Sequence, residues 1–218
     1  MLYKDRQEAG RDLAQSLKEY EGLPDVDVLA LPRGGVPVAY EVSSGLNLPL
    51  DIFIVRKLGV PGQEELAMGA IATGGVRVLN EDIIRQLQIS DSAIAAVAAQ
   101  EERELERRER LYRKNLPPLK IRGKSIILID DGLATGASMR AAALALRELQ
   151  AKQVIVAVPV AAQSTCNEFQ SYADRIICLK SPEPFYGVGC WYEHFPQNTD
   201  EEVIELLERS IHEKSRAG

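Results

Sequence analysis

The stretch Ser125-Ile-Ile-Leu-Ile-Asp-Asp-Gly-Leu-Ala-Thr-Gly-Ala-Ser138 decides the fold that the sequence predicts. Its apolar start is typical of a strand buried on both faces, as in a parallel sheet. Asp130 and Asp131 follow at the carboxyl end of that strand, where open α/β sheets bind ligands. Beyond them, Gly132 and Gly136 allow a tight loop whose N–H groups point inward at the start of a helix. Two carboxylates beside such a phosphate cradle suit a sugar phosphate.

Strands and helices alternate on both sides of this stretch. Apolar runs predict strands at 26–31, 50–55, 76–79, 125–129, 154–160 and 175–179. Helical spacing predicts helices at 4–20, 36–44, 80–87, 91–114, 137–149, 164–172 and 200–214. Alternation of this kind implies a parallel sheet with right-handed crossovers. We therefore expect an α/β protein with an open parallel sheet flanked by helices.

Composition excludes several other classes of protein. Lys and Arg number 26 against 32 Asp and Glu, for a net charge of −6, which argues against binding nucleic acid through its phosphates. No apolar run approaches the roughly 18 residues that span a bilayer, so no membrane partner is expected. Met1 leads directly into charged residues, so no signal peptide is expected and the predicted location is cytoplasmic.

The cysteines are sparse. Cys166, Cys178 and Cys190 show no Cys-x-x-Cys spacing, and an odd set of three fits a reducing compartment better than a disulfide framework. We expect Cys178 to be a buried strand residue, and packing is the favoured role of Cys190.

Two further segments carry basic residues near strand ends. Leu31-Pro-Arg-Gly-Gly-Val36 follows a strand and precedes a helix, so Arg33 can offer a forked donor to a diphosphate while Gly34 and Gly35 let backbone N–H groups approach the same anion. A simple turn is the alternative. Arg56-Lys57 is predicted to end the second strand, where both side chains are either solvated or near an anion.

The middle of the chain combines a glycine-containing loop with a charged helix. Residues 59–75 contain Pro61 and several glycines, so we expect a loop that can close over a ligand; Glu64 and Glu65 face solvent or substrate. In the helix 91–114 both charge signs alternate, with favourable i,i+4 pairs such as Glu104–Arg108 and Glu106–Arg110. A solvated helix face explains this pattern better than a binding patch.

The strand-acid-loop stretch resembles the phosphoribosyl-pyrophosphate (PRPP) signature of the type I phosphoribosyltransferases. That signature is a hydrophobic strand, two acids and a short loop ending in Thr-Gly-x-[ST]. The matching residues are Asp130, Asp131, Thr135, Gly136 and Ser138. The alternative is an ordinary strand-to-helix turn with a capping acid.

The resemblance implies a PRPP site with Mg²⁺ as cofactor. Asp130 and Asp131 would hold the ribose hydroxyls directly or through metal-bound water, and the loop would hold the 5′-phosphate. Arg33 and Lys57 are the implied catalytic residues because they would stabilise the departing pyrophosphate, and the loop at Arg33 often has unusual backbone geometry in this family. The implied PRPP-binding residues are Arg33, Gly34, Gly35, Arg56, Lys57, Asp130, Asp131, Gly132, Leu133, Ala134, Thr135, Gly136, Ala137 and Ser138.

The aromatic segment 184–195 looks like the family's hood, the small lobe over the base. A flat heterocycle would stack on an aromatic ring, and Tyr186 and Trp191 are the candidates; the alternative is that they pack the lobe onto the sheet. His194 and His212 receive no catalytic role. The resemblance divides a single domain 1–218 into a core of about 1–58 and 121–181, a flexible loop and helical insertion of about 59–120, a hood of about 182–199 and a terminal helix of about 200–214.

The sequence departs from the 6-oxopurine members of the family at Ala134, where they usually carry an aspartate that acts on the purine ring. The loop looks more like adenine-type or unassigned loops. The wider pattern looks like stand-alone bacterial proteins called predicted phosphoribosyltransferases. We therefore expect a nucleotide-metabolism transferase that acts on PRPP and a nucleobase or similar heterocycle. A non-catalytic PRPP or nucleotide regulator is the alternative, a metal-dependent hydrolase is weaker, and a homodimer is left open.

Overall fold

The structure, a computed structural model, describes residues 2–114, 116 and 118–217, with side chains up to residue 213. Its main sheet has five parallel strands in the order β2-β1-β6-β7-β8. The strands are β1 (Val26–Ala30), β2 (Leu50–Ile52), β6 (Ser125–Ile129), β7 (Gln153–Val160) and β8 (Arg175–Lys180). The predicted open parallel sheet is confirmed.

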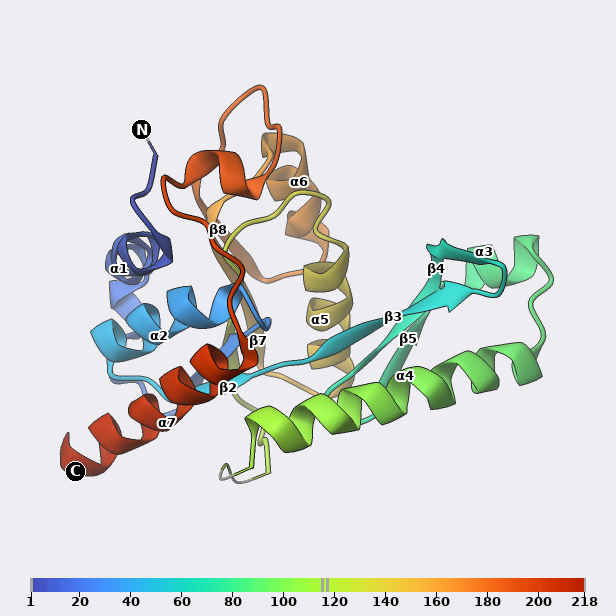
Figure 1. The fold of residues 1–218 in the computed structure, drawn as a ribbon, viewed down its shortest axis with the longest axis horizontal. Coiled ribbons are helices and arrows are strands. Elements are labelled where there is room, and N and C mark those ends of the chain that lie inside the picture. The colour runs from blue at the N-terminus through green and yellow to red at the C-terminus, as the bar shows by residue number, and fades with distance from the viewer. Residues whose placement is uncertain (1, 115, 117, 218) are drawn as a thin grey trace.

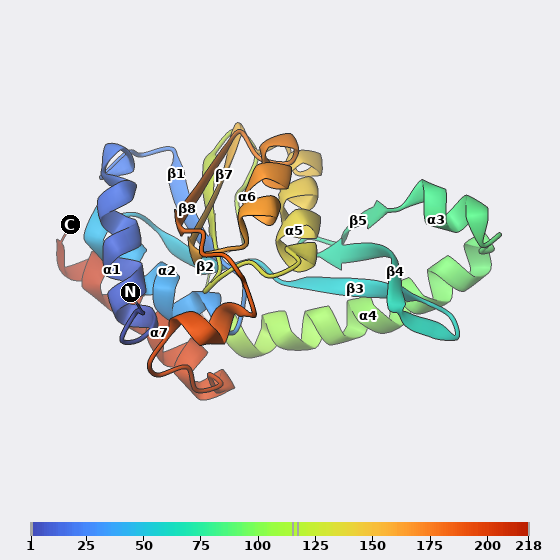
Figure 2. The ribbon, with the colours of Figure 1, turned by 90° about the horizontal axis from the view of Figure 1, so that it is seen from above.

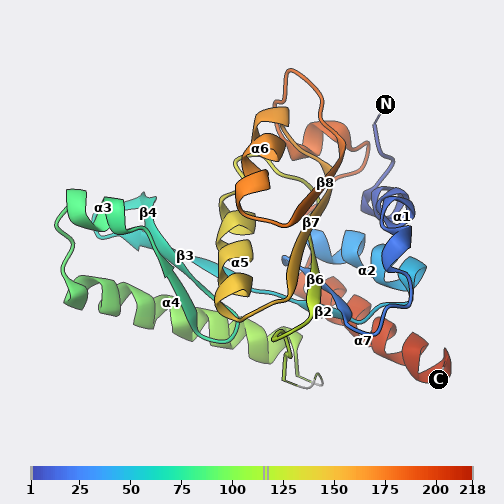
Figure 3. The same ribbon diagram turned by 180° about the vertical axis from the view of Figure 1, so that it is seen from behind.

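Helices cover both faces of this sheet because alternate strand residues point to opposite sides. The helices α1 (Arg6–Ser16), α2 (Gly35–Leu46) and α7 (Asp200–Ala217) share one core with Val28 and Ile127. The helix α5 (Ala137–Glu148) shares the other core with Leu29 and Leu128, as does Cys166 of α6 (Gln163–Glu168). Figures 1 and 3 show α1 and α2 on one side of the sheet and α5 on the other.

A second sheet lies outside this body. The strands β3 (Val55–Val60), β4 (Gln63–Ala72) and β5 (Val76–Leu79) are antiparallel in the order β3-β4-β5. Two helices follow, α3 (Glu81–Gln86) and α4 (Asp91–Tyr112). Residues 55–112, called the arm below, extend away from the main sheet, with α3 at the far end (Figures 1 and 2).

The arm corrects the expected loop at 59–75, which is largely the strand β4. Two of its glycines serve close strand packing: a Cβ at Gly69 would lie 2.4 Å from the carbonyl oxygen of Val78, and one at Gly59 would lie 2.9 Å from that of Glu64. The predicted strand 50–55 also divides, because β2 ends at Ile52 and β3 begins at Val55. The predicted helix 164–172 likewise divides into α6 and the short 3₁₀ helix Phe169–Ser171.

The small sheet lies between α5 and α4. On one face, Ala72 belongs to the same core as α5, and Val55 and Val76 pack against that core. On the other face, Leu58 and Met68 share a core with α4. The apolar stripe of α4, which includes Ile94, Ala98 and Leu105, is therefore buried.

The charged face of α4 forms the expected i,i+4 pairs. Glu104 and Arg108 approach to 2.8 Å, and Glu106 and Arg110 to 2.7 Å. Arg107 and Arg108 lower the pKa of Glu104 to about 2. The second half of the helix thus carries its own charge compensation.

Cys178 lies in a strand as expected, but the pairing, the burial of Cys178 and the packing of Cys190 differ from expectation. Cys166 in α6 and Cys178 in β8 form a disulfide across 12 residues of sequence. Spacing alone cannot reveal such a pairing, because it depends on how the fold brings helix and strand together. Cys178 is half-buried rather than buried, and Cys190 is exposed in the 3₁₀ helix Val188–Trp191. Within the described residues, no helix has the length and apolar character to cross a membrane.

Candidate functional site

The site lies where β1 and β6 are neighbours at the carboxyl edge of the main sheet. From β1 the chain leaves through α2 toward β2, and from β6 it leaves through α5 toward β7, so the two connections diverge. Divergence of this kind opens a crevice that binds ligands in open α/β sheets. Ala30 pairs with Ile129, which places residues 31–35 beside residues 130–136.

The loop after β1 packs directly on the acid pair. A Cβ at Gly34 would lie 2.2 Å from Oδ2 of Asp131, and one at Gly35 would lie 2.7 Å from the carbonyl oxygen of Ile129. A Cβ at Gly35 would require a shift of the backbone, and one at Gly34 would require the Asp131 carboxylate to move. The Pro32–Arg33 peptide bond is cis, which agrees with the unusual geometry that the resemblance implied. The N-terminus of α2 therefore faces the carboxylates.

The loop after β6 is held by hydrogen bonds to β7 and α6 on its outer side, and its inner side is open. The N–H of Leu133 donates to the carbonyl oxygen of Val160 at 2.9 Å, and the hydroxyl of Thr165 donates to that of Ala134 at 2.8 Å. Gly136 has φ +68°, and a Cβ there would lie 2.5 Å from the ring of Phe169. The loop is therefore held in one shape by β7 and α6.

The side chains that the sequence assigned to the phosphate are accessible. Thr135 and Ser138 are both exposed, at the end of the loop and in the first turn of α5. Their hydroxyls and the N-terminus of α5 thus remain open to an anion.

Burial sets the electrostatics of the acid pair. Burial raises the pKa of Asp130 well above its usual range, and the neighbouring Asp131 raises it further. Burial also raises the pKa of Asp131, although Arg6 opposes the shift. The Asp131 N–H donates to Oδ1 of Asp130 at 2.8 Å, so the backbone of one acid holds the side chain of the other. Two carboxyl groups so placed favour a cation or hydroxyl donors beside them.

Arg6 is the site residue that the sequence-based reasoning missed. Its Nε and Nη2 both lie 2.8 Å from Oδ2 of Asp131, and the residue is only 6% exposed. In the sequence it is one of several charged residues in an N-terminal helix, 125 positions from its partner. Only the packing of α1 beside the sheet brings the two together.

The hood rests on the same acids. The hydroxyl of Tyr192 donates to the backbone oxygen of Asp131 at 2.6 Å, and a Cβ at Gly132 would lie 2.6 Å from Cγ1 of Val188. Trp191, predicted to contact a base, lies in the 3₁₀ helix Val188–Trp191, and its indole nitrogen is buried with no hydrogen-bond partner among the described residues. Tyr186, the other candidate, is 81% exposed.

The basic candidates are divided between the site and the arm. Arg33 follows β1 and lies 3.7 Å from Asp200 through its Nη1. Arg56 and Lys57 do not end a strand, because they lie inside β3. Arg56 pairs with Glu101 of α4 at 2.7 Å, and Lys57 with Glu65 of β4 at 3.6 Å. Both are therefore engaged within the arm.

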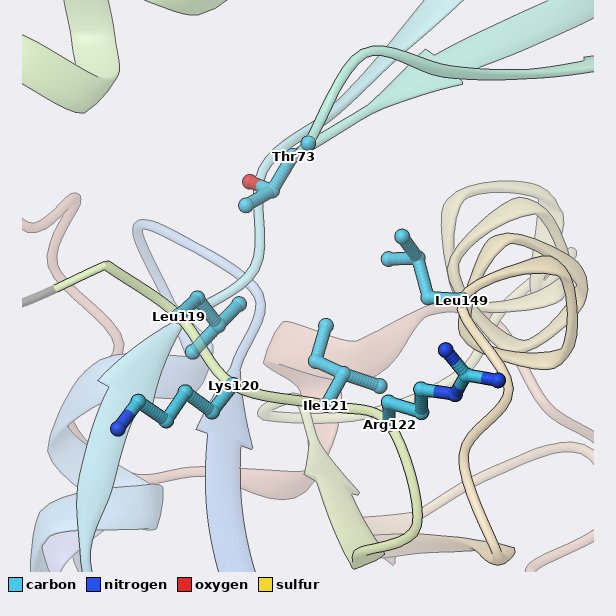
Figure 4. A pocket seen from close by; sticks show the side chains of 7 residues that line it. Thr73, Leu119, Lys120, Ile121, Arg122 and Leu149 are labelled. Atoms are coloured by element: carbon cyan, nitrogen blue, oxygen red, sulfur yellow. The ribbon is translucent and has the colours of Figure 1, made fainter.

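A cavity of about 430 Å³ lies at the opposite edge of the main sheet, where β6 begins (Figure 4). It is lined by Thr73, Gly74, Leu149 and the segment 119–122 that leads into β6. Because it adjoins the amino end of β6 and the carboxyl end of α5, it is separate from the acid pair.

The family model described as "Phosphoribosyl transferase domain" matches residues 62–192, which include the acid pair and its loop. The chain belongs to the phosphoribosyl transferase family. Its relatives include Mycobacterium tuberculosis proteins named "Putative phosphoribosyl transferase MT0597" (strain CDC 1551 / Oshkosh) and "Putative phosphoribosyl transferase Rv0571c" (strain ATCC 25618 / H37Rv). Each is 44% identical over 217 residues, which is 100% of this chain and 49% of the relative. The chain thus spans about half the length of these relatives.

A solved structure that resembles this phosphoribosyl transferase chain is that of TT1426 from Thermus thermophilus. It is 39% identical to this chain, and the match covers 96% of this chain and 99% of that one, with a TM-score of 0.85. The same arrangement of elements therefore recurs in a related chain.

Proposed function

We propose that this protein is a phosphoribosyltransferase that uses PRPP and Mg²⁺ to ribosylate a nitrogenous base. A ring nitrogen of the base forms a bond to ribose C1 while the bond from C1 to the pyrophosphate oxygen breaks. The electron pair leaves with pyrophosphate, and the nitrogen loses its proton. The observation that carries the proposal is that the acid pair, the Gly136 loop and residues 31–35 lie together at the carboxyl ends of β1 and β6, where the two chain connections diverge.

The 5′-phosphate and the ribose would occupy the β6 side of this crevice. Asp130 and Asp131 would accept hydrogen bonds from the ribose hydroxyls. The loop of Gly132, Leu133, Ala134, Thr135, Gly136, Ala137 and Ser138 would bind the phosphate through backbone N–H groups and two exposed hydroxyls. The fixed loop shape supports this role because it requires little reorganisation on binding.

The diphosphate would lie on the β1 side, near Arg33 and the N–H groups of Gly34 and Gly35. The pair between Arg33 and Asp200 is half-exposed, so it is weak and a diphosphate can compete for the guanidinium. Positive charge at this place would stabilise the leaving group as its charge develops. Lys57 could join it only if the β3–β4 hairpin closed over the crevice.

The carboxylates also fit Mg²⁺. This ion typically takes one or two carboxylates and completes its shell with water and substrate phosphate oxygens. Asp130 and Asp131 supply such a pair, and the described residues contain no larger cluster of His, Cys, Asp or Glu that would form a closed metal cage. When bound, the ion would supply positive charge beside the diphosphate.

The hood would receive the base. The buried indole N–H of Trp191 lacks an acceptor within the described chain, so it can donate to a ligand. Tyr186, which is 81% exposed, is the other candidate for contact with the base. Ala134 supplies no carboxylate, which favours adenine or another heterocycle over hypoxanthine and guanine.

A screen of nucleobases by release of pyrophosphate from PRPP tests this function. The expected result is PRPP-dependent and Mg²⁺-dependent release with at least one base, lost in Asp131→Asn. The matched control is Asp174→Asn, an acid outside the crevice, which should retain activity. Tight binding of PRPP without turnover of any base would instead favour a regulator on the same fold.

A further inference from the structure

The hood is bound to the start of the chain through backbone hydrogen bonds. The N–H of Tyr3 donates to the carbonyl oxygen of Trp191 at 2.9 Å, and the N–H of Glu193 donates to that of Tyr3 at 2.8 Å. The N–H of His194 donates to the carbonyl oxygen of Lys4 at 3.0 Å. Residues 3–4 thus form a short ladder with the hood, immediately before Arg6.

Arg6 connects this assembly to the acid pair. While Nε and Nη2 lie 2.8 Å from Oδ2 of Asp131, Nη1 donates to the carbonyl oxygen of Pro196 at 2.8 Å. The guanidinium also lies 3.8 Å from the ring centroid of Phe195. One buried cation therefore joins a carboxylate of the ribose site to two residues of the hood.

A second connection returns from the hood to the same aspartate. Phe195 stacks on Tyr192 with ring centroids 4.9 Å apart, and the Tyr192 hydroxyl donates to the backbone oxygen of Asp131 at 2.6 Å. The contacts form a closed circuit from the Asp131 side chain through Arg6, Phe195 and Tyr192 to the Asp131 backbone. A shift at Asp131 must therefore be accommodated by the hood.

The Arg6 side chain is not required to hold α1 on the sheet. Leu13 and Leu17 are fully buried against the main core, and Ala9 is buried near the hood. All three guanidinium nitrogens of Arg6 instead serve Asp131 or Pro196. The side chain thus acts on the site, while the helix is held by its apolar face.

We propose that Arg6 is a positioning residue that couples occupation of the ribose site to the placement of the hood. A ligand oxygen or hydrated cation that engages Oδ2 of Asp131 must share that oxygen with Arg6 or displace its Nε and Nη2. The displaced guanidinium then moves relative to Phe195 and Pro196, and the base-binding lobe adjusts. The inference rests on the proposed function and adds to it the residue through which the ribose site acts on the hood.

The experiment follows Trp191, the single tryptophan of the chain, which lies in the hood. PRPP with Mg²⁺ is titrated while tryptophan emission is recorded, and calorimetry on the same samples measures binding. The wild type should show an emission change that saturates with the calorimetric Kd. Arg6→Met should still bind PRPP, with a Kd within about tenfold of wild type, but lose the emission change.

Arg11→Met is the matched control, because Arg11 lies on the same helix with 60% of its side chain exposed. It should behave as the wild type. If Arg11→Met also loses the emission change, or if Arg6→Met keeps it at saturation, the inference is overturned. Should Arg6→Met fail to fold, Arg6→Lys decides: a reduced change supports the coupling, because the ammonium lacks the fork, and a full change overturns it.

Two outcomes separate this inference from the proposed function. If the wild type binds PRPP by calorimetry without any change in emission, the coupling is wrong and the function stands. If calorimetry detects no binding of PRPP to the wild type, both are wrong.

Discussion

At Asp130 and Asp131, folding favours the protonated carboxyl groups, whereas binding of a cation favours the ionised ones. Burial raises the pKa of both carboxyl groups, so the folded state disfavours their ionised forms. Because the pKa of Asp130 is higher in the folded than in the unfolded state, this residue costs stability as the pH rises from its usual titration range through its folded pKa. A ligand that brings a cation would offset that cost.

Replacing Asp130 by Asn should therefore stabilise the free protein while removing PRPP binding. The amide oxygen can still accept the N–H of Asp131, but it carries no charge to bury. We expect a gain of about 0.5–2 kcal/mol at neutral pH by thermal unfolding.

The matched control for this prediction is Asp174→Asn. Burial there would raise the pKa, but the Val154 N–H and Arg147 lower it overall, so ionised Asp174 stabilises the fold. This variant should lose stability. A destabilised Asp130→Asn protein would contradict the electrostatic interpretation.

Replacing Arg33 by Ala should weaken binding of PRPP far more than binding of ribose 5-phosphate. Arg33 lies on the β1 side of the crevice, whereas Thr135 and Ser138 lie on the β6 side. Titration calorimetry with both ligands measures the difference. Equal losses for the two ligands would place Arg33 away from the diphosphate.

The acceptor spectrum should reflect Ala134. A positioned general base contributes roughly 10²–10⁴ in rate, and alanine cannot supply one to a 6-oxopurine. We expect kcat/KM for adenine or another heterocycle to exceed the values for hypoxanthine and guanine. Efficient use of hypoxanthine that persists in Glu64→Ala and Glu65→Ala variants would show that the missing aspartate is a poor guide.

At the scale of elements, the sequence was informative where structure is local. The strand β6, the acid pair, the glycine loop and α5 are consecutive, so pattern and turn chemistry predicted all of them. The strand β4 was missed because the glycines of 59–75 suggest a loop, whereas Gly59 in β3 and Gly69 in β4 allow neighbouring strands to approach closely. The Cys166–Cys178 disulfide and the Arg6–Asp131 pair were missed because each depends on elements that only the complete fold brings together.

The β3–β4 hairpin is the remaining candidate for an element that closes over the ligand. Its mobile part is expected to be shorter than the predicted loop 59–75. Ala70 and Ile71 are paired on both sides, with β3 and β5, whereas Pro61 and Gly62 form the turn at the end. Amide exchange in the free protein should be slow at 70–71 and fast at 62–66, since Pro61 has no amide hydrogen. The turn should become slower when PRPP and a base bind. Uniform protection of 62–71 without ligand would argue against a lid.

At the scale of the whole molecule, Asp200 at the start of α7 contacts both the arm and the loop that carries Arg33. The C-terminal end of α4 meets the start of α7, where the Tyr112 hydroxyl donates to Asp200, and Asp200 also pairs with Arg33. Burial and Asp200 raise the pKa of Tyr112 to about 12, so this hydroxyl remains a donor at neutral pH. Arg113 fixes the same end to Asp51 in β2 at 2.9 Å. The root of the arm therefore borders the pyrophosphate side of the proposed site.

The proposed function requires that PRPP and Mg²⁺ bind between the carboxyl ends of β1 and β6. The most direct test is the melting temperature of the wild type and of Asp131→Ala, each with and without millimolar PRPP and Mg²⁺. Ligand at about 100 times its Kd adds about 2.7 kcal/mol, which corresponds to a rise of roughly 5–10 °C for a chain of this size. We expect such a rise in the wild type and little or none in Asp131→Ala; an unchanged melting temperature in the wild type would contradict binding of PRPP at this site.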